Sequence, residues 1–486
     1  MESVKSCKLN IKTLFPWIIA TKGHASSSSQ PSANVTSESV VVVKVVRSTS
    51  VGAPVLNNKY QTTTDIFFFE KMAATLLRGV QLKGKVTSTA RWFSQVSGLN
   101  EVVIVSATRT PVGSFRSSLA SLPAPQLGAI AIKSAIEKAG IPAEEVKEVY
   151  MGNVLQAGEK QAPARQAALG AGLPLATPCT TINKVCASGM KSIMLAAQSL
   201  MCGHQDVMVA GGMESMSNVP FIMAREAPAY GGLKLEDLIV HDGLTDVYNK
   251  FHMGNCAENT AKNLQITRED QDEFAISSYK RSQAAAANGT LAKEITPVEV
   301  PQRRGPGVTV EADEEYNKVK FDKVPSLRPV FVKDGTVTAA NASTLNDGAA
   351  ALVIMTSAAA SRLGVTPLAR IVGFADAAVA PIDFPIAPSP AVEKLLKQTG
   401  VSKDDITMWE INEAFSAVVL ANIKLLDLDP AKVNVNGGAV SIGHPIGMSG
   451  ARITSHMVHN LQPGQKGVAA ICNGGGGASS ILIEKL

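Results

Sequence analysis

Apolar and polar residues follow two distinct periods in the part of the chain that begins near residue 99. A run rich in β-branched residues at 101–111 ends in Pro111 and predicts a buried strand followed by a turn. At 125–139, apolar residues recur every three or four positions up to Gly140, which is the pattern of a helix and its end. Strands and helices alternate in this manner as far as residue 210. This alternation indicates an α/β fold with a mainly parallel sheet.

The alternation stops between residues 212 and 342, where the chain is more charged and contains long helical stretches. The clearest helix there has Thr267 as its N-cap, Asp270 near the capping position and an end at Asn288-Gly289. An insertion of this length over an α/β core often carries substrate contacts. We therefore expect this segment to cover the core and to contribute to a binding site.

The second part of the chain repeats features of the first. An apolar strand leads through a polar turn into a helix at 180–190 and again at 408–418. A strand followed by clustered glycines occurs at 209–215 and again at 471–479. This internal echo predicts two similar α/β halves, the first of which contains the insertion.

Composition narrows the class of protein. With 45% hydrophobic and 18% charged residues among 486, the chain can bury large cores and is not a disordered protein. No run approaches ~18 consecutive apolar residues, so we expect no membrane-spanning helix. The six cysteines are expected to be free thiols, and neither they nor the seven histidines have the spacing of a zinc site.

The net charge of +5 is unevenly distributed. Residues 1–98 hold twelve Lys or Arg and four Asp or Glu, a net charge of +8, which leaves −3 on residues 99–486. The positive charge therefore belongs to a leader at 1–98, which argues against a nucleic-acid-binding body. Residues 72–93 are basic, contain serine and threonine and lack acidic residues, which is typical of a mitochondrial transit peptide. The alternative is a basic tail without a targeting role.

The end of this leader contains a candidate processing site. The tetrad Arg91-Trp92-Phe93-Ser94 is similar to a matrix-protease site, with cleavage after Phe93. Met72 is a second candidate for the initiator, and the sequence leaves both starts open. The leader thus predicts a protein of the mitochondrial matrix.

Cys186 lies in the motif NKVCASG, between a predicted strand and a predicted buried helix. The positive end of a helix dipole lowers the pKa of a thiol, and the small residues that follow leave room for an acyl group. These features favour a nucleophile, whereas the alternative is an inert buried cysteine.

His444 and Cys472 occupy two glycine-rich segments. Glycines in 436–447 let the backbone approach a ligand closely, and the His444 imidazole could take the proton of Cys186. Cys472 precedes four glycines at 474–477, and this run lacks the Gly-Lys-Ser/Thr ending of a phosphate-binding loop. Bare amides beside a thiol suggest an oxyanion hole next to a second base.

Asn412 stands in the second polar turn, at the place that matches Cys186 in the first. Its amide could hold a water or a carbonyl oxygen, or could simply cap a helix. Two thiols and an imidazole at three turns fit Claisen condensation and its reverse, thiolysis. One thiolate accepts an acyl group, and a second base removes a proton beside a thioester carbonyl. The reaction needs two bases and two oxyanion sites.

The motifs NKVCASG, NEAF, GGAVSIGHPIG and CNGGGGAS together resemble those of the thiolase family, and the resemblance spans residues 101–486. The segments TINKVCASGM, AGGMESMSNVP, LTDVYNKFHMG, AANASTLNDGAA and FADAAVAPIDFPIAP are most similar to mitochondrial thiolases that act on acetoacetyl-CoA. The resemblance implies acetyl-CoA C-acetyltransferase activity, with a place in ketone-body metabolism and isoleucine degradation.

The resemblance also implies the thiolase fold, in which two similar βαβαβαββ halves pack as a layered α/β/α/β/α core with an inserted loop domain. The first half would comprise residues 99–217 and 343–367, the inserted CoA-binding loop domain residues 218–342, and the second half residues 368–486.

By this resemblance, Cys186 is the nucleophile that becomes acetylated, His444 is the base that activates it, and Cys472 is the acid/base for the incoming acetyl group and for the CoA sulfur. His444 and a water held by Asn412 would form one oxyanion hole, and the N–H groups of Cys186 and Gly474 the other. The residues that match CoA-binding positions are Leu244, His252, Met253, Tyr279, Lys318, Lys323, Phe331, Ala339, Ser343 and Phe415. Lys318 stands where the family pattern has Arg.

The resemblance further implies a potassium ion, no organic prosthetic group and a homotetramer built from dimers. The residues that match the ion site are Tyr279, Ala339, Ala340, Ala342 and Val440, mostly through carbonyl oxygens, which a hard cation prefers. The pair Phe384-Pro385 resembles a feature of members that accept 2-methylacetoacetyl-CoA.

Three alternatives compete with this interpretation. A broad-range 3-ketoacyl-CoA thiolase of β-oxidation would share the catalytic residues and have a longer acyl tunnel. A condensing synthase of the fatty-acid type would need a second histidine where this chain has Cys472. A thiolase-like carrier without activity would lack a reactive residue, yet Cys186, His444 and Cys472 are all present.

Overall fold

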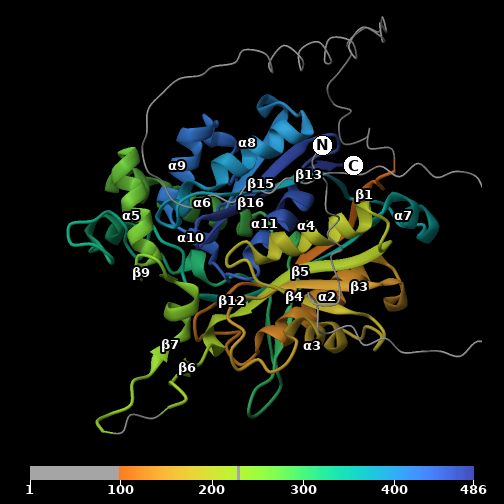
Figure 1. Cartoon of the computed structure of the whole chain (residues 1–486), viewed down its shortest axis with the longest axis horizontal. Coiled ribbons are helices and arrows are strands. Elements are labelled where there is room, and N and C mark those ends of the chain that lie inside the picture. Colours follow the sequence, from red (N-terminus) through yellow and green to blue (C-terminus); the bar gives the residue numbers. More distant parts are fainter. Residues whose placement is uncertain (1–97, 227–229) are drawn as a thin grey trace, which may run out of the picture. The chain divides into compact units, whose positions relative to one another are not determined.

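The computed structural model describes residues 98–226 and 230–486, which are coloured in Figure 1. The predicted leader, with its transit peptide and its cleavage site after Phe93, lies outside these residues. The strands of the main sheet are β1 (Val102–Arg109), β2 (Gly113–Ser114), β3 (Glu148–Gly152), β4 (Cys179–Ile182), β5 (Val207–Ser215), β12 (Asn346–Thr356), β13 (Ala369–Ala378), β14 (Ile406–Ile411), β15 (Lys466–Asn473) and β16 (Gly477–Lys485).

The α-helices of the described residues cover this sheet and the insertion. They are α2 (Ala124–Ala139), α3 (Pro163–Gly170), α4 (Ser188–Met201), α5 (Met253–Leu264), α6 (Arg268–Ala287), α7 (Ser357–Leu363), α8 (Pro388–Thr399), α9 (Ser416–Leu426), α10 (Ala439–Ile442) and α11 (Ser449–Asn460).

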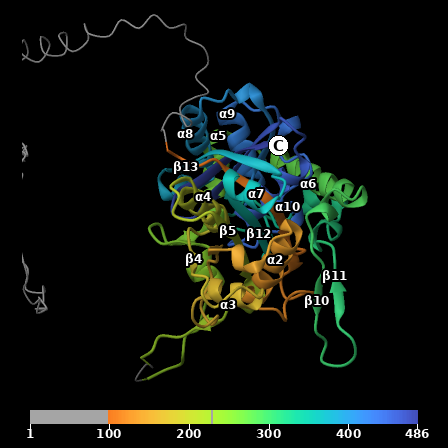
Figure 2. The ribbon, with the colours of Figure 1, turned by 90° about the vertical axis from the view of Figure 1, so that its right-hand side faces the viewer.

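The insertion adds three small strand pairs to α5 and α6. These pairs are β6 (Phe221–Ile222) with β7 (Glu236–Asp237), β8 (Thr245–Asp246) with β9 (Phe251–His252), and β10 (Val298–Val300) with β11 (Val308–Val310). Figure 2 shows the β10–β11 hairpin projecting from the body.

The main sheet has ten strands, in the order β14-β15-β16-β13-β1-β12-β5-β3-β4, with β2 beside β12. The two parts of the sheet meet where β1 pairs with β13, through Val103 with Arg370 and Ile104 with Ala369. Strands from residues 102–215 and 346–356 lie on one side of this junction, and strands from residues 369–485 lie on the other.

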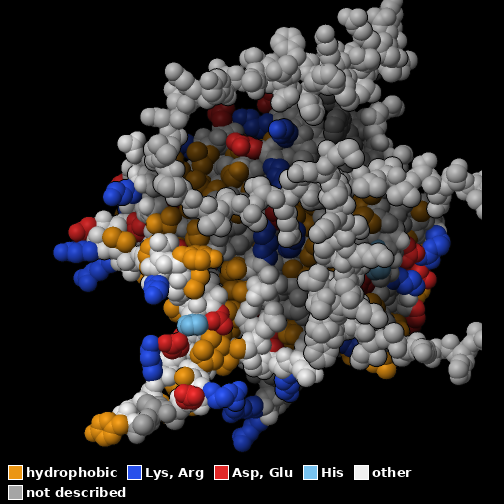
Figure 3. Space-filling model, viewed as in Figure 1, with side chains coloured by type: hydrophobic (Ala, Val, Ile, Leu, Met, Phe, Trp, Pro, Cys, Tyr) orange, Lys and Arg blue, Asp and Glu red, His pale blue; other side chains and the backbone are white. Residues whose placement is uncertain are grey.

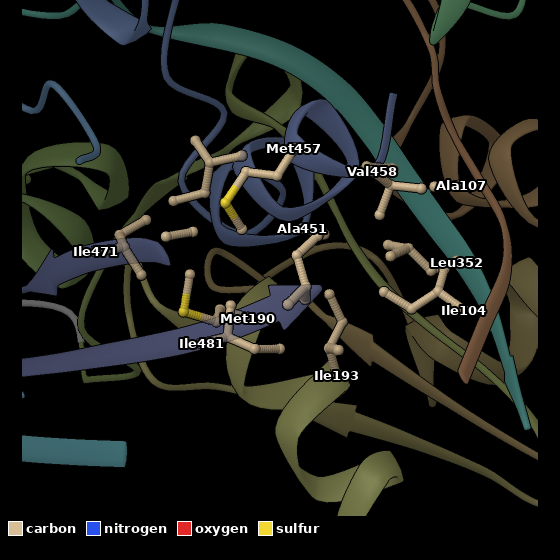
Figure 4. Packing of buried hydrophobic residues seen from close by; sticks show 14 of the residues in the cluster. Ile104, Ala107, Met190, Ile193, Leu352, Ala451, Met457, Val458, Ile471 and Ile481 are labelled. Carbon is tan, nitrogen blue, oxygen red and sulfur yellow. The ribbon is translucent and has the colours of Figure 1, made fainter. Parts of the chain in front are cut away.

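Three helical layers separate and cover the two parts of the sheet (Figure 1). Helices α2 and α3 pack on the outer face of the first part, and α8 and α9 pack on the outer face of the second. Helices α4 and α11 lie between the two parts, where Met190 and Met457 meet Ile104, Ile471 and Ile481 (Figure 4). This is the predicted five-layered α/β/α/β/α core.

The expectation of a mainly parallel sheet is wrong. Parallel pairs join β3 to β4 and β5, and β14 to β15, whereas the central strands β1, β12, β13 and β16 pair antiparallel. The connections explain the difference. β15 and β16 are joined by a tight glycine turn, which can link only antiparallel neighbours, and β12 follows the long insertion, which imposes no direction.

Apart from the two-residue β2 and the insertion between β5 and β12, the first half has the strand and helix order β1-α2-β3-α3-β4-α4-β5-β12, which is the predicted βαβαβαββ. In the second half, the third strand is reduced to one bridge between Trp409 and Val433. Asn434 adopts φ 46° there, and its side chain bonds the N–H and the C=O of Ile411 at 2.9 and 2.8 Å. This side-chain bonding replaces a backbone ladder. The exact domain boundaries stay a prediction.

The predicted end signals of two helices are confirmed. The N–H of Asp270 donates to Thr267 Oγ1 at 3.1 Å and the Asp270 carboxylate accepts from the Thr267 N–H at 2.8 Å, so both groups of a capping box are present at the start of α6. Helix α2 ends at Gly140, whose φ of 66° is easily adopted only by glycine. Across residues 98–226 and 230–486, no helix combines the length and the apolar character that crossing a membrane requires.

Candidate active site

Cys186 lies in the turn between β4 and α4, as predicted, and this turn is strained and firmly anchored. Val185 adopts φ 48°, a left-handed conformation that is costly for a β-branched residue. Lys184 holds the turn, because its ammonium contacts Asp376 and donates to Ala478 O at 3.0 Å and to Ser479 Oγ at 2.8 Å. These partners belong to β13 and β16, so the second half fixes the turn that carries Cys186 in the first.

The expected lowering of the Cys186 pKa by the helix dipole is wrong in its net direction. Burial of the sulfur raises the pKa of Cys186 to about 11, and hydrogen bonds from the N–H groups of Gly474 and of Cys186 itself only partly offset this. The two amides that contact the sulfur are the pair predicted to form an oxyanion hole. Cys186 is therefore a neutral thiol beside two backbone N–H donors.

His444 is held in one orientation. The backbone N–H of His444 donates to Asn346 Oδ1 at 2.9 Å, and the ring Nδ1 lies 2.6 Å from Ser449 Oγ. The Ser449 hydroxyl donates to Pro445 O at 2.9 Å, which leaves its oxygen to accept the proton of Nδ1. This assignment makes Nε2 the basic nitrogen, and no described residue bonds it.

The imidazole of His444 is neutral in the resting site. Burial, and in second place the charge of Arg452, lower the pKa of His444 to about 3. A neutral imidazole with a free Nε2 can accept a proton from Cys186 as the thiol attacks a substrate.

Cys472 lies near the end of β15, and it is fully buried. Burial raises the pKa of Cys472 well above its usual value, and ionisation of Cys186 would raise it further. The following glycines form the turn to β16, in which Gly475 and Gly476 have φ of 83° and 90°. A Cβ on Gly476 would lie 2.3 Å from Val379 O, so this position tolerates only glycine.

Asn412 follows β14 and is 1% exposed. Its N–H donates to Ala470 O at 3.0 Å, but both polar atoms of its side chain lack a partner among residues 98–226 and 230–486. A buried amide in this state fits a site for an ordered water.

A cavity of about 370 Å³ brings most of the predicted residues together. Its predicted lining residues are Cys186, Leu244, His252, Met253, Phe331, Ala342, Ser343, Phe415, His444 and Gly474. Cys472 belongs to the same buried cluster as the lining residues Met253 and Phe415 and packs behind them. Asn412 precedes the lining residue Phe415 by three positions in the sequence. Sequence reasoning missed Phe115, Met216 and Ile446. The glycines on either side of Ile446 could have indicated that this residue lies at the site. No comparable feature of the sequence marks Phe115.

An aromatic wall lines one side of the cavity. His252 stacks on Phe331 with ring centroids 4.6 Å apart, and Phe331 meets Phe415 edge-on at 6.2 Å. Nδ1 of His252 accepts the N–H of Gly254 at 3.0 Å, and burial lowers the pKa of His252. The wall is thus a neutral, apolar surface suited to an acyl or pantetheine chain.

Four predicted CoA-binding residues do not line this cavity. These are Tyr279, Lys318, Lys323 and Ala339. The Lys318 ammonium contacts Ser114 and lies 3.7 Å from the Glu315 carboxylate, whereas that of Lys323 is exposed, 3.6 Å from Asp322. Any contact they make must be with parts of a ligand outside the cavity.

Comparison with known families identifies the fold that carries this site. Residues 102–358 match the N-terminal domain of thiolase, and residues 365–485 match the C-terminal domain. The chain belongs to the thiolase family. The predicted fold is confirmed.

Relatives within this family are very similar to the chain. A Danio rerio protein called mitochondrial acetyl-CoA acetyltransferase is 76% identical over 397 residues, which cover 82% of this chain and 94% of the relative. The Homo sapiens protein of the same name is 71% identical over 389 residues, covering 80% and 91%. A crystal structure of an Ascaris suum thiolase in complex with coenzyme A is 48% identical, with a TM-score of 0.77, and covers 79% of this chain and all of that one.

Proposed function

We propose that this chain is an acetyl-CoA C-acetyltransferase that reversibly joins two molecules of acetyl-CoA into acetoacetyl-CoA and CoA. The observation that carries the proposal is the meeting of Cys186, His444 and Gly474 at one cavity, with Cys472 packed behind its wall. The relatives named mitochondrial acetyl-CoA acetyltransferase support the choice of substrate.

In the first half-reaction, Cys186 takes an acetyl group. His444 Nε2 accepts the thiol proton as the sulfur attacks the thioester carbonyl, and the N–H groups of Cys186 and Gly474 stabilise the oxyanion. CoA then leaves as a thiolate, and Cys472 gives it a proton. Because burial raises the pKa of Cys472, the group is protonated in the resting site and has a proton to give.

In the second half-reaction, the Cys472 thiolate removes a proton from the methyl group of a second acetyl-CoA. The carbanion attacks the carbonyl of acetyl-Cys186, and the Cys186 sulfur leaves. The thioester oxygen that carries the enolate charge faces protonated His444 Nε2 and a water held by Asn412, whose amide has no other partner in the described chain. Thiolysis of acetoacetyl-CoA follows the same steps in reverse.

Leu244, His252, Met253, Phe331, Ser343 and Phe415 would hold the pantetheine arm, since all of them line the cavity. Tyr279, Ala339, Lys318 and Lys323 would contact CoA further out. The existing contacts of Lys318 with Ser114 and Glu315 make it the weakest of these assignments.

We also propose a potassium site at Tyr279, Ala339, Ala340, Ala342 and Val440. The surroundings fit a cation, because the charges of Glu315 and Glu413, after burial, help to raise the pKa of Tyr279 to about 12. That shift reports a negative potential around the ring, and carbonyl oxygens suit a hard cation. When bound, the ion would fix the loop that precedes Ser343.

Phe384 lines the acyl end of the cavity and is 2% exposed. We propose that this pocket also accepts 2-methylacetoacetyl-CoA, which would place the enzyme in isoleucine degradation as well as ketone-body metabolism. Residues 72–93 would direct it to the mitochondrial matrix, in line with the names of its relatives.

We propose a homotetramer. Apolar side chains are exposed in the segment that carries β6 and β7, at the lower left of Figure 3, including Phe221, Leu233 and Leu235. A monomer rarely exposes such a patch without a partner.

Steady-state thiolysis tests the proposal against the β-oxidation alternative. The purified chain would be assayed with acetoacetyl-CoA, 2-methylacetoacetyl-CoA and a long-chain 3-ketoacyl-CoA, each in potassium and in sodium buffer. Activity on the first two alone, raised by potassium, is the expected result. Good long-chain turnover without a potassium effect would favour the β-oxidation thiolase, and no turnover at all would favour a carrier.

A further inference from the structure

A strip of buried polar side chains lies between α11 and the end of β14 and includes Asn412. Glu410 belongs to β14, and Asn412, which follows the last residue of that strand, extends the ladder by donating its N–H to Ala470 O at 3.0 Å, so the two side chains point to the same side. Arg452 lies three residues after Ser449, the partner of His444, on the adjoining face of α11. Glu410, Asn412 and Arg452 are each 1% exposed.

The strip contains polar atoms without partners in the described chain. Arg452 Nε and Nη1, Glu410 Oε1 and both side-chain atoms of Asn412 have none. The Arg452 and Glu410 side chains approach only to 4.0 Å, between Nη2 and Oε2. Guanidinium and carboxylate groups are not buried dry in this state, so ordered water must fill the space between them.

The other charged groups around Arg452 are already satisfied. Glu294 bonds Arg109 and His456 at 2.6 and 2.9 Å. Glu413 accepts bonds from Ser278, Asn434 and the N–H of Val440.

Arg452 therefore has one loosely placed carboxyl partner, Glu410, whose own pKa burial raises to about 7, and the charge of Arg452 acts on His444. Arg452 is the charged group that helps to lower the pKa of His444.

We propose that Arg452 is a positioning residue for the oxyanion site of His444 and Asn412. Waters that bridge Arg452 to the Asn412 amide orient the catalytic water, and the guanidinium adds positive potential where the enolate oxygen forms. This inference rests on the proposed function and concerns one of its two oxyanion sites.

The two oxyanion sites serve different carbonyls, which makes the inference testable. Acetylation of Cys186 places charge on the oxygen beside the N–H groups of Cys186 and Gly474. Exchange of labelled CoA into acetyl-CoA needs this step alone. Thiolysis of acetoacetyl-CoA must also expel an enolate, whose oxygen faces His444 and Asn412. Loss of Arg452 should therefore slow thiolysis and spare exchange.

The variants are made in the full chain. Arg452→Met with Glu410→Gln removes both charges together, so neither is left buried alone. Thiolysis should fall about 10- to 100-fold, less than the ~10²–10³ lost with a direct oxyanion donor. KM for acetoacetyl-CoA and the exchange rate should stay within about threefold of the original chain. Arg452→Lys keeps the positive charge but lacks the planar guanidinium group, so its rate of thiolysis should fall less than that of the double variant.

The matched control removes another buried Arg–carboxylate pair. Arg109→Met with Asp313→Asn breaks a bidentate pair held at 2.6 and 2.9 Å, and Glu294, the other partner of Arg109, keeps its contact with His456 at 2.9 Å. It should lower the melting temperature without changing the ratio of thiolysis to exchange. If the Arg452 and Glu410 double variant does not fold, Arg452→Lys supplies the ratio.

An unchanged ratio of thiolysis to exchange, or equal loss of both, would overturn the role of Arg452. A crystal structure with no water between Arg452 and Asn412 would also overturn it. Failure of the unaltered chain to cleave acetoacetyl-CoA would instead refute the proposed function, so the two failures are distinguishable.

Discussion

Alkylation of Cys186 tests whether the resting site holds a thiol or a thiolate. Burial raises the pKa of Cys186 to about 11 and lowers the pKa of His444 to about 3, so both groups are neutral at physiological pH. A thiol with such a pKa is ionised in roughly one molecule in 3,000 at pH ~7.5. Because the thiolate is the reactive species, alkylation by iodoacetamide should accelerate about tenfold per pH unit from pH ~6.5 to ~9. A thiolate–imidazolium pair would instead react at a constant rate over this range.

The assay follows the mass of the Cys186 peptide after timed alkylation of the full chain. Exposed Cys202 in the same digest reports reagent quality, and buried Cys256 reports any unfolding. His444→Asn should leave the slope with pH unchanged, since the imidazole does not hold the thiol proton at rest. A plateau between pH ~6.5 and ~8, or a slope that changes in His444→Asn, would refute the reasoning.

Three further results are expected. Cys472→Ser should lower the rate of thiolysis about 10²- to 10⁴-fold. Mass spectrometry of the intact variant should still show an acetyl group on Cys186 after incubation with acetyl-CoA. An unacetylated protein would contradict the role assigned to Cys472. Gly476→Ala should lower the free energy of unfolding by about 1–3 kcal/mol, because the added Cβ would lie 2.3 Å from Val379 O. The control Gly475→Ala has a similar φ of 83° but no atom within 4 Å of its Cβ, so it should lose less in the same urea titration. Equal losses would exclude the contact with Val379 as the cause. Because the pKa of His444 is lowered in the folded chain, the unfolded chain binds one more proton than the folded chain below the ordinary histidine pKa of about 6.5. The contribution of His444 to the free energy of unfolding is therefore present above that pH and is lost towards pH ~3, at up to ~1.4 kcal/mol per pH unit. His444→Asn should flatten this pH dependence between pH ~4 and ~6, and an identical slope would argue against a neutral buried imidazole.

Local features of the fold were predictable from the sequence. The capping pair Thr267 and Asp270 and the glycine after α2 act through neighbouring backbone groups, so their effect is visible in a short stretch of sequence. The turn that carries Cys186 was found for the same reason, since a strand pattern and a helix pattern meet there.

Features that depend on distant residues were not predictable in this way. The helix dipole is a local property, but the net pKa of Cys186 is set by the tertiary packing that buries the sulfur. The contact of Lys184 with Asp376 joins residues 192 positions apart. The antiparallel centre of the sheet likewise follows from how an insertion and a hairpin return the chain. Neither the period of the hydrophobic residues nor the spacing of the motifs shows in which direction the chain re-enters the sheet.

The proposed oxyanion hole takes one N–H from each half of the molecule, Cys186 from the first and Gly474 from the second. A relative shift of the halves by ~1 Å would move one donor out of hydrogen-bond range of the substrate oxygen. Lys184 and Asp376 resist such a shift by tying the two halves together beside the nucleophile. Hinge opening, by which many two-lobed enzymes admit their substrates, would have to break this contact and the pairing of β1 with β13. Entry of the acyl chain with the two halves in contact would keep both N–H donors in place.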